Sequence, residues 1–385
     1  MRFVVIGASA AGITAVQKLR ECNPEADITL ISKDTEVYSR CILYHWLDES
    51  RTLEEMNFAG LDFDTRLQIN WMKGMEVVSV DTENKTVHTD QDIEVPYDRL
   101  CIAAGSHTNF PPIPGLREGK NIFGFRSLND AEQIKKAAQD AENIFIMGAG
   151  LVGIDVAAGL INYGKKIYLV DMGPYMMPIQ LDGYAAGVYQ RLFEEKKVTQ
   201  FYGIGAREFV LDELKNCCKV LLQDGTEIPV DLVINCAGVR PNVEFLKDSP
   251  ILCDKYGLVI DKYGRTNVED VFGAGDVTGR SPVWSAAVRE GITAAYAMSG
   301  ILKEEMDYFT PKSSMHFLDV PTVSIGKVNG YDNSYNEIIR KSPDSYEKIV
   351  VKDGVIVGAL LQGDISESGK LAEAVRLGKE YEKEN

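Results

Sequence analysis

Short apolar runs lead directly into glycine-rich turns at two places in the chain. Residues 2–6 run into Gly7, and residues 143–147 run into Gly148. The residues after each turn are expected to open a helix. A strand, a glycine-rich turn and a helix in this order are typical of the βαβ units of doubly wound α/β domains. The pattern therefore predicts two such domains in one chain.

Both turns have the residue types that hold a pyrophosphate. The first consists of Gly7, Ala8, Ser9, Ala10, Ala11 and Gly12, and the second of Gly148, Ala149, Gly150, Leu151, Val152 and Gly153. Backbone N–H groups and a helix N-terminus bind the phosphates, and glycines stand where a Cβ would collide with them. Two bound dinucleotides would form an electron relay.

The first turn departs from the usual fingerprint. Ser9 replaces the middle glycine, and Ser32 follows the second strand, at residues 28–31, where an acid is usual. We expect the Ser32 hydroxyl to bind a ribose and Lys33 to reach a phosphate. The alternative is that residues 28–31 form an ordinary buried strand, because short glycine patterns give false positives.

The second turn is closer to the fingerprint. A strand at residues 167–170 ends at Asp171, about 20 residues after the turn, as the motif requires. A carboxylate there accepts both ribose hydroxyls of NADH and repels the 2′-phosphate of NADPH, and no arginine follows it. NADH is therefore the expected dinucleotide. An acidic strand end exposed to solvent is the alternative.

Composition narrows the class of protein. The chain has 385 residues, of which 45% are apolar and 25% charged, which favours a globular protein of more than one domain. Seven cysteines without metal-type spacing predict neither a metal site nor a disulfide framework. A net charge of −16 argues against nucleic acid as a partner. Since the first strand leaves no room for a cleavable signal and no apolar stretch is long enough to span a bilayer, we expect a cytoplasmic protein without a membrane partner.

Three further segments carry a family resemblance. Residues 97–106, followed by a proline-rich stretch at 111–115, look like the strand and hinge that leave an FAD domain. Residues 270–277 look like a second FAD signature, and residues 237–242 like the return from an NADH domain. With the glycine turns, these ordered motifs cover nearly all of residues 1–300. The chain resembles the FAD-dependent pyridine-nucleotide-disulfide oxidoreductase family.

The resemblance implies an α/β protein with two doubly wound, Rossmann-like domains and a small α+β C-terminal domain. The FAD domain would comprise residues 1–112 and 243–310, the NADH domain residues 113–242, and the C-terminal interface domain residues 311–385. In the last of these, Asp353-Gly354 predicts a hairpin turn, and residues 371–381 predict a helix.

The resemblance also implies the flavin contacts. Asp276 would bind the ribityl chain, and a helix starting near Trp284 would direct its N-terminus at the flavin pyrimidine. The remaining expected cofactor contacts are Arg40, Val77, Ala104, Gly105, Gly238, Gly275 and Val277. For Trp284 and Val77, a plain core position is the alternative.

Cys41 follows Tyr38 by three residues, as the redox cysteine follows an aromatic residue in coenzyme A-disulfide reductases and NADH oxidases. Rubredoxin reductases usually have proline at this place. A helix N-terminus and Arg40 would favour the thiolate, which could then attack a disulfide, persulfide or polysulfide. The alternative is a small buried residue. On a continuous helix His45 would share a face with Cys41.

Asp155 stands where the family generally has glutamate, near the nicotinamide and flavin N5. A carboxylate stabilised by the helix dipole is the alternative role.

The expected function is FAD-dependent hydride transfer from NADH, followed by electron transfer to a small redox protein such as rubredoxin. The net charge of −16 argues against binding of an acidic rubredoxin, unless basic residues form one local binding surface. The candidates for such a surface are Arg40, Arg51, Arg66 and Lys73. A Cys41-dependent reductase of coenzyme A disulfide, persulfide or polysulfide, or an NADH oxidase, is the alternative, although Ala10 replaces the histidine of peroxidases and oxidases. A flavin-based redox sensor or subunit also remains open.

The C-terminal region is short and lacks the His-Pro element of full disulfide reductases. Its absence excludes a glutathione-reductase mechanism. The short C-terminal region also makes a monomer or homodimer the expected oligomeric state.

Overall fold

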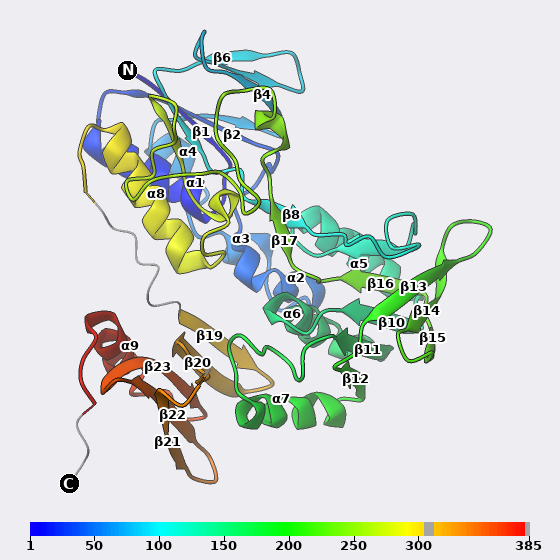
Figure 1. The fold of residues 1–385 in the computed structure, drawn as a ribbon. Coiled ribbons are helices and arrows are strands. Elements are labelled where there is room, and N and C mark those ends of the chain that lie inside the picture. Colours follow the sequence, from blue (N-terminus) through cyan, green and yellow to red (C-terminus); the bar gives the residue numbers. More distant parts are fainter. Residues whose placement is uncertain (304–311, 331, 382–385) are drawn as a thin grey trace. The chain divides into compact units, whose positions relative to one another are not determined.

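The computed structural model describes residues 1–303, 312–330 and 332–381, which divide into two compact units (Figure 1). The described residues of the first unit are 1–43, 51–107 and 239–303. Those of the second are 44–50, 108–238 and the described residues from 312 onward. The expected domain boundary between residues 310 and 311 lies outside the described residues.

The first unit is built on a five-stranded parallel sheet. Its strand order is β18-β7-β1-β2-β3, with bounds β1 (Arg2–Ile6), β2 (Asp27–Ser32), β3 (Asn70–Lys73), β7 (Arg99–Ile102) and β18 (Val271–Gly273). Both faces of the sheet are buried, as parallel sheets require. The run at residues 2–6 was therefore correctly predicted to be a strand.

Alternate residues of β1 enter two different cores. Phe3 and Val5 pack with α1 (Ala10–Cys22) and α8 (Trp284–Met298), which lie against each other in Figure 1. Val4 and Ile6 pack on the other face, where the core includes residues of the antiparallel strands β4 (Val77–Asp81), β5 (Thr86–Thr89) and β6 (Glu94–Pro96).

Short elements complete this part of the chain. They are the 3-10 turns η1 (Arg40–Ile42), η3 (Glu244–Leu246) and η4 (Asp276–Thr278), the helices α3 (Leu53–Met56) and α4 (Phe63–Arg66), and a two-stranded sheet of β8 (Ser106–Thr108) and β17 (Val239–Pro241).

The second unit contains another five-stranded parallel sheet, in the order β12-β11-β10-β16-β9. Its bounds are β9 (Ile122–Gly124), β10 (Asn143–Met147), β11 (Lys166–Asp171), β12 (Val198–Tyr202) and β16 (Leu232–Asn235). Its helices are α5 (Leu128–Asp140), α6 (Leu151–Leu160), the 3-10 turn η2 (Ile161–Tyr163) and α7 (Gly183–Glu195). An antiparallel sheet of β13 (Ala206–Leu211), β14 (Cys217–Leu222) and β15 (Glu227–Pro229) shares a core with it through Phe145 and Phe209.

The four-residue helix α2 (Tyr44–Leu47) belongs to this second unit and packs on α5 and α6. Gly159 makes the approach possible, because a Cβ there would lie 2.9 Å from the Tyr44 carbonyl oxygen and 3.1 Å from Leu47 Cβ. Tyr163 donates a hydrogen bond to the Leu47 carbonyl at 2.7 Å, and Lys135 pairs with Glu49 at 2.7 Å.

The second unit also contains a five-stranded antiparallel sheet near the C-terminus, which we call the C-terminal sheet. Its order is β19-β20-β23-β22-β21, with bounds β19 (Lys312–Phe317), β20 (Val320–Gly326), β21 (Tyr335–Lys341), β22 (Tyr346–Lys352) and β23 (Val355–Gln362). The predicted hairpin is present, with positive φ at both Asp353 (51°) and Gly354 (82°), as a two-residue turn of type I′ requires. The predicted helix is α9 (Ser368–Leu377), which begins earlier than expected and ends at Gly378, where φ is 59°.

These elements confirm the predicted α/β fold with two doubly wound sheets and a small α+β C-terminal part. Among the described residues, no helix combines the length and the apolar character needed to cross a membrane.

Candidate dinucleotide sites

The first glycine turn brings backbone atoms close together. Gly7 has φ of 107°, and a Cβ there would lie 2.2 Å from the Ala103 carbonyl oxygen. A Cβ on Gly12 would lie 1.8 Å from the Gly7 carbonyl oxygen. Ser9 is the N-cap of α1, and its side chain makes no cap hydrogen bond to the helix. The N-terminal N–H groups of α1 therefore suit a pyrophosphate, and the residues present fit the phosphates of FAD.

The second turn repeats this geometry. Gly148 has the same φ of 107°, and a Cβ on Gly153 would again lie 1.8 Å from the carbonyl oxygen five residues earlier. Gly150 is the N-cap of α6, and the space around its missing Cβ is open to 4 Å. A phosphate can thus approach this backbone closely. Asp171 ends β11 and accepts hydrogen bonds from the N–H groups of Ala149 and Gly173, both at 2.6 Å.

The second FAD signature is organised by two residues that the sequence analysis did not select. Ser106 donates a hydrogen bond to the Asp276 carboxylate at 3.1 Å. Glu290, only 1% exposed, accepts one from the Gly275 N–H at 2.6 Å. Gly275 itself has φ of 82°. A single acidic residue among the small residues in the middle of α8 is the sequence signal that could have identified Glu290.

The other expected flavin contacts fall into two groups. Gly105 (φ 68°) and Gly238 (φ 86°) both adopt the left-handed conformation, and the Ala104 carbonyl accepts a hydrogen bond from the Asn242 side chain at 2.8 Å. Val77 and Val277 are buried apolar core residues, and Trp284 lies edge-on to Phe58 with ring centroids 4.7 Å apart. These three residues therefore have packing roles in the first unit, and their contact with a flavin stays a prediction.

The Ser32 hydroxyl has two partners within the protein. It donates to the Asp34 carbonyl at 2.7 Å and accepts from Trp71 Nε1 at 2.9 Å. Lys33 is two-thirds exposed and pairs with Glu76 at 2.6 Å. The carboxylate of Asp34 is itself engaged, because it accepts a hydrogen bond from the Tyr38 hydroxyl at 3.0 Å.

Arg40 joins a charged cluster with Asp34 and Tyr38. Its guanidinium lies 2.5 Å from the Asp34 carboxylate and 2.6 Å from the Tyr38 hydroxyl. Burial opposes the charge, but Tyr38 and Asp34 outweigh it and raise the pKa of Arg40. The arginine is thus a fixed positive charge next to Cys41 in the sequence.

Cys41 lies in the three-residue turn η1 and is exposed. The alternative of a buried structural cysteine is therefore wrong for this chain. The expected helix is also shorter than predicted, because η1 ends at Ile42 and α2 begins separately at Tyr44. Cys41 and His45 are consequently not on one continuous helix. His45 lies 2.6 Å from Ser50 Oγ and 3.5 Å from Asp48.

Asp155 lies in the second turn of α6. Burial raises the pKa of its carboxyl well above the ordinary value. Burial is the cause of this shift, and the choice between a role near the nicotinamide and stabilisation by the helix dipole stays a prediction. Burial, followed by the charge of Asp155, also raises the pKa of Cys236, which follows β16.

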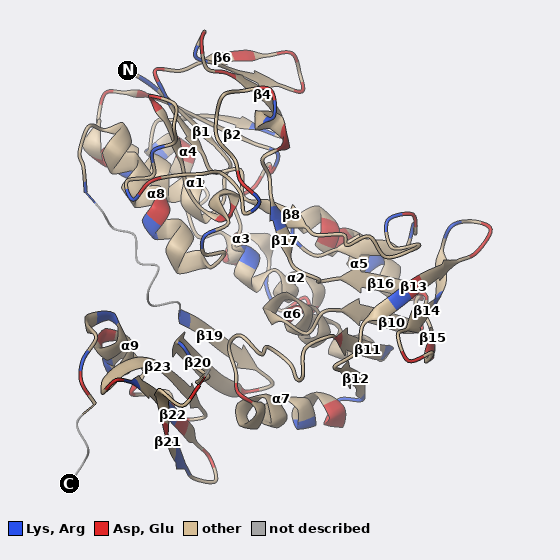
Figure 2. Ribbon diagram, viewed as in Figure 1, with Lys and Arg blue, Asp and Glu red and all other residues tan. Residues whose placement is uncertain are grey.

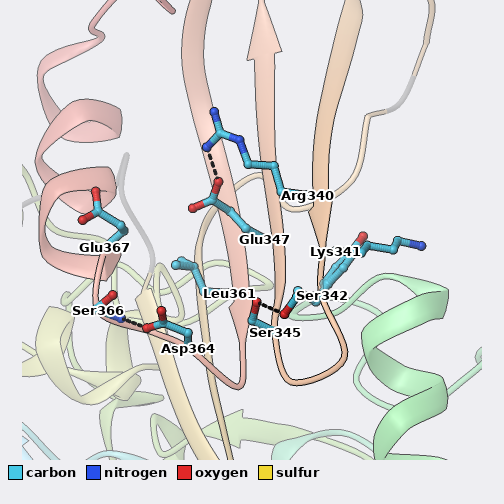
Figure 3. A pocket seen from close by; sticks show the side chains of 10 residues that line it. Arg340, Lys341, Ser342, Ser345, Glu347, Leu361, Asp364, Ser366 and Glu367 are labelled. Atoms are coloured by element: carbon cyan, nitrogen blue, oxygen red, sulfur yellow. Dashed lines mark hydrogen bonds and ion pairs between the residues drawn. The ribbon is translucent and has the colours of Figure 1, made fainter. Parts of the chain in front are cut away.

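A surface depression in the C-terminal sheet lies near the turn between β21 and β22 (Figure 3). Its polar groups bond one another: Arg340 pairs with Glu347 at 2.5 Å, Ser342 with Ser345 at 2.8 Å, and the Ser366 N–H donates to Asp364 at 2.9 Å. None of the residues that line it belongs to either glycine turn.

Comparison with known families agrees with this geometry. Residues 1–291 match the family described as pyridine nucleotide-disulphide oxidoreductase. The chain belongs to this family. Residues 311–379 match the rubredoxin NAD+ reductase C-terminal domain.

Two curated relatives show how the match extends along the chain. Nitrite reductase [NAD(P)H] of Bacillus subtilis is 28% identical over 377 residues, which are 96% of this chain but 46% of that protein. NADH-rubredoxin oxidoreductase of Clostridium acetobutylicum is 25% identical over 390 residues, covering 99% of this chain and 96% of that one. The chain spans about half the length of the nitrite reductase that it matches.

Solved structures share the fold. The NADH:rubredoxin oxidoreductase from Clostridium acetobutylicum has a TM-score of 0.79 at 22% identity, covering 99% of this chain and 96% of that chain. A NAD-dependent persulfide reductase from A. fulgidus has a TM-score of 0.88 at 22% identity, and the match covers 99% of this chain and 77% of that chain. The predicted family, the oxidoreductase class and the FAD and NADH cofactors are confirmed by the family match.

Proposed function

We propose that this protein oxidises NADH and passes the electrons to a small redox protein such as rubredoxin. The observation that carries the proposal is the order of matches along the chain, in which a rubredoxin NAD+ reductase C-terminal domain follows the oxidoreductase family segment. A relative named NADH-rubredoxin oxidoreductase aligns with 99% of the chain. We propose the three-part domain layout of the sequence analysis together with this function.

The residues of the chain would divide the work between two sites. The N-terminus of α6 and Asp171 bind the pyrophosphate and adenosine ribose of NADH, while the N-terminus of α1 and Asp276 hold FAD. Bound FAD supplies the acceptor for hydride and the donor of electrons. Asp155, whose carboxyl pKa is raised by burial, would orient the nicotinamide.

Anaerobic mixing with rubredoxin tests the proposal. The FAD-loaded protein is reduced with one equivalent of NADH, and oxidised rubredoxin is then added. Re-oxidation of the flavin at a rate that rises with rubredoxin concentration supports the proposal. A flavin that NADH reduces but rubredoxin leaves reduced would contradict it.

A sulfur reductase is the second candidate, because Cys41 is exposed and follows the fixed charge of Arg40. Its thiolate would attack one sulfur of coenzyme A disulfide and release the other as coenzyme A thiolate. The mixed disulfide formed on Cys41 would then be reduced by two electrons from NADH through FAD. Unchanged coenzyme A disulfide turnover by Cys41→Ser would exclude this route.

The charges of the described residues do not indicate a basic surface that would attract an acidic redox protein. Arg40, Arg66 and Lys73 all lie near acids, namely Asp34, Asp62 and Asp64 respectively. Figure 2 shows acidic and basic residues interspersed along the ribbon. The proposal therefore rests on the family segments and not on electrostatic steering.

We also propose a cytoplasmic location and a monomer or homodimer. A flavin-based sensor whose reduction changes its affinity for a partner is the remaining alternative. Steady-state NADH turnover with any acceptor counts against the sensor.

A further inference from the structure

A lysine is buried where the C-terminal sheet contacts the start of α7, within the second unit. Lys348 of β22 is 2% exposed. Its Nζ lies 2.8 Å from Glu337 and 3.3 Å from Asp182, and it donates to Asn329 at 3.4 Å. Tyr346, two residues earlier on β22, donates a 2.5 Å hydrogen bond to the same Asp182 carboxylate. A buried lysine needs such partners, because an unpaired charge is costly to remove from water.

Asp182 is the last residue of a segment that begins beside the predicted ribose site. This segment, residues 172–182, follows Asp171 directly and ends at the N-cap of α7, where Asp182 accepts from the Ala185 N–H at 3.0 Å. The Asn329 side chain donates to the Leu181 carbonyl at 3.1 Å. Side chains of the C-terminal part thus hold one end of the segment.

The middle of the segment is attached to the glycine turn. The Met177 N–H donates to the Ala149 carbonyl at 2.8 Å, and Met177 is fully buried with φ of 49°. A non-glycine residue rarely adopts such a φ unless surrounding contacts impose it. Residues 172–182 therefore extend from the predicted ribose carboxylate, past the phosphate turn, to Lys348 and Tyr346.

We propose that Lys348 and Tyr346 are positioning residues for NADH. By fixing Asp182 they hold residues 172–182, and through Ala149 the glycine turn, in the conformation that receives the adenosine half of the dinucleotide. Ordering this segment in advance reduces the conformational entropy that binding would otherwise cost. The C-terminal sheet then contributes to NADH affinity without touching NADH. This inference rests on the proposed function, since it assumes that the second glycine turn binds NADH.

The test uses the full-length, FAD-loaded protein and oxidised NAD+, whose binding is measured by calorimetry without turnover. Lys348→Met keeps the length of the side chain and removes its charge, and Tyr346→Phe removes one hydroxyl. Lys352→Met is the matched control, because Lys352 lies on the same strand and its Nζ lies 5.2 Å from the Tyr335 ring centroid, away from Asp182. We expect Lys348→Met to raise the Kd about tenfold, a typical coupling between distinct sites, and Tyr346→Phe to raise it less.

Steady-state kinetics separates positioning from general damage. We expect KM for NADH to rise in Lys348→Met while kcat at saturating NADH stays within about twofold of wild type, since a loss of binding that is equal in the ground state and the transition state has this signature. Equal NAD+ affinity in wild type, Lys348→Met and Tyr346→Phe would overturn the inference. A fall in kcat and flavin content without a change in Kd would overturn it as well, because it would show a purely structural role.

Two further results complete the test. If Lys348→Met does not fold, Tyr346→Phe and Asn329→Ala are measured in its place with the same expectations. If wild type itself binds no NAD+, the proposed function fails, and the inference fails with it.

Discussion

Asp171 accepts a 2.6 Å hydrogen bond from the backbone N–H of Ala149, which joins the end of β11 to the middle of the second glycine turn. Its other carboxylate oxygen accepts from Gly173 at 2.6 Å. The residue predicted to select the dinucleotide therefore also braces the turn that holds the pyrophosphate. Each carboxylate oxygen retains acceptor capacity for a ribose hydroxyl.

Replacing this carboxylate is expected to weaken NADH discrimination. In Asp171→Asn the charge that repels the 2′-phosphate of NADPH is lost, and one of two acceptor oxygens becomes a donor. Because a hydrogen bond to a charged group contributes about 1.5–3 kcal/mol, we expect kcat/KM for NADH to fall about 10- to 100-fold. The value for NADPH should change much less. Parallel losses with both dinucleotides would show that Asp171 only supports the turn.

Ser106 is expected to affect FAD retention through Asp276. Ser106→Ala removes the 3.1 Å hydrogen bond and leaves the Asp276 carboxylate less well oriented. A single hydrogen bond of about 1 kcal/mol corresponds to about fivefold weaker FAD binding. FAD affinity is measured by fluorescence quenching in a double-mutant cycle with Asp276→Ala. Additive effects of the two substitutions would mean that Ser106 does not act through Asp276.

Asp155 is expected to make folding stability depend on pH. Since its folded-state pKa is raised by burial, the native state binds a proton that the unfolded state loses above its own pKa of about 4. The stabilisation from Asp155 is fully present below the unfolded-state pKa and is lost as the pH rises through the folded-state pKa. Between these two pKa values the free energy of unfolding falls by up to about 1.4 kcal/mol per pH unit. Asp155→Asn removes this dependence.

The stability difference between Asp155→Asn and wild type should therefore grow with pH across this window and then level off. Urea unfolding at several pH values measures it. A constant difference would show that the Asp155 carboxyl titrates normally.

Gly159 is expected to be intolerant of a side chain. In Gly159→Ala the new Cβ meets the Tyr44 carbonyl oxygen at 2.9 Å, so α2 must shift on α6, at a cost of about 1–3 kcal/mol. Gly187 of α7 provides the control, because its nearest neighbour is the flexible end of Arg191 at 3.7 Å. Gly187→Ala should stabilise the protein by about 0.5–1 kcal/mol. Equal thermal unfolding of both variants would contradict the packing of α2 on α6.

Strands with continuous apolar runs, and turns built from residue types that accept positive φ, were predictable from the sequence. The strands at residues 2–6 and 143–147 lie where the apolar patterns place them. These segments are predictable because burial on both faces of a parallel sheet demands continuous apolar runs. The Asp353-Gly354 turn was predictable because few residue types accept positive φ at two successive positions.

Short helices and buried polar contacts were not predictable in this way. The turn η1 and the helix α2 contain three and four residues, too few to show a period of 3.6. Lysine at position 348 has the sequence pattern of a solvated residue, and only the fold brings Asp182 to it, from 166 positions earlier in the chain. Ser106 and Asp276, 170 positions apart, illustrate the same limit.

The most direct test of the account is an anaerobic titration of the purified, FAD-loaded protein with NADH, followed by flavin absorbance. We expect the visible absorbance of the oxidised flavin to bleach in proportion to added NADH, and the bleaching to be complete at about one equivalent, because one hydride reduces one FAD. A folded protein that takes up no FAD, or whose bound FAD keeps its absorbance with NADH in excess, would contradict it.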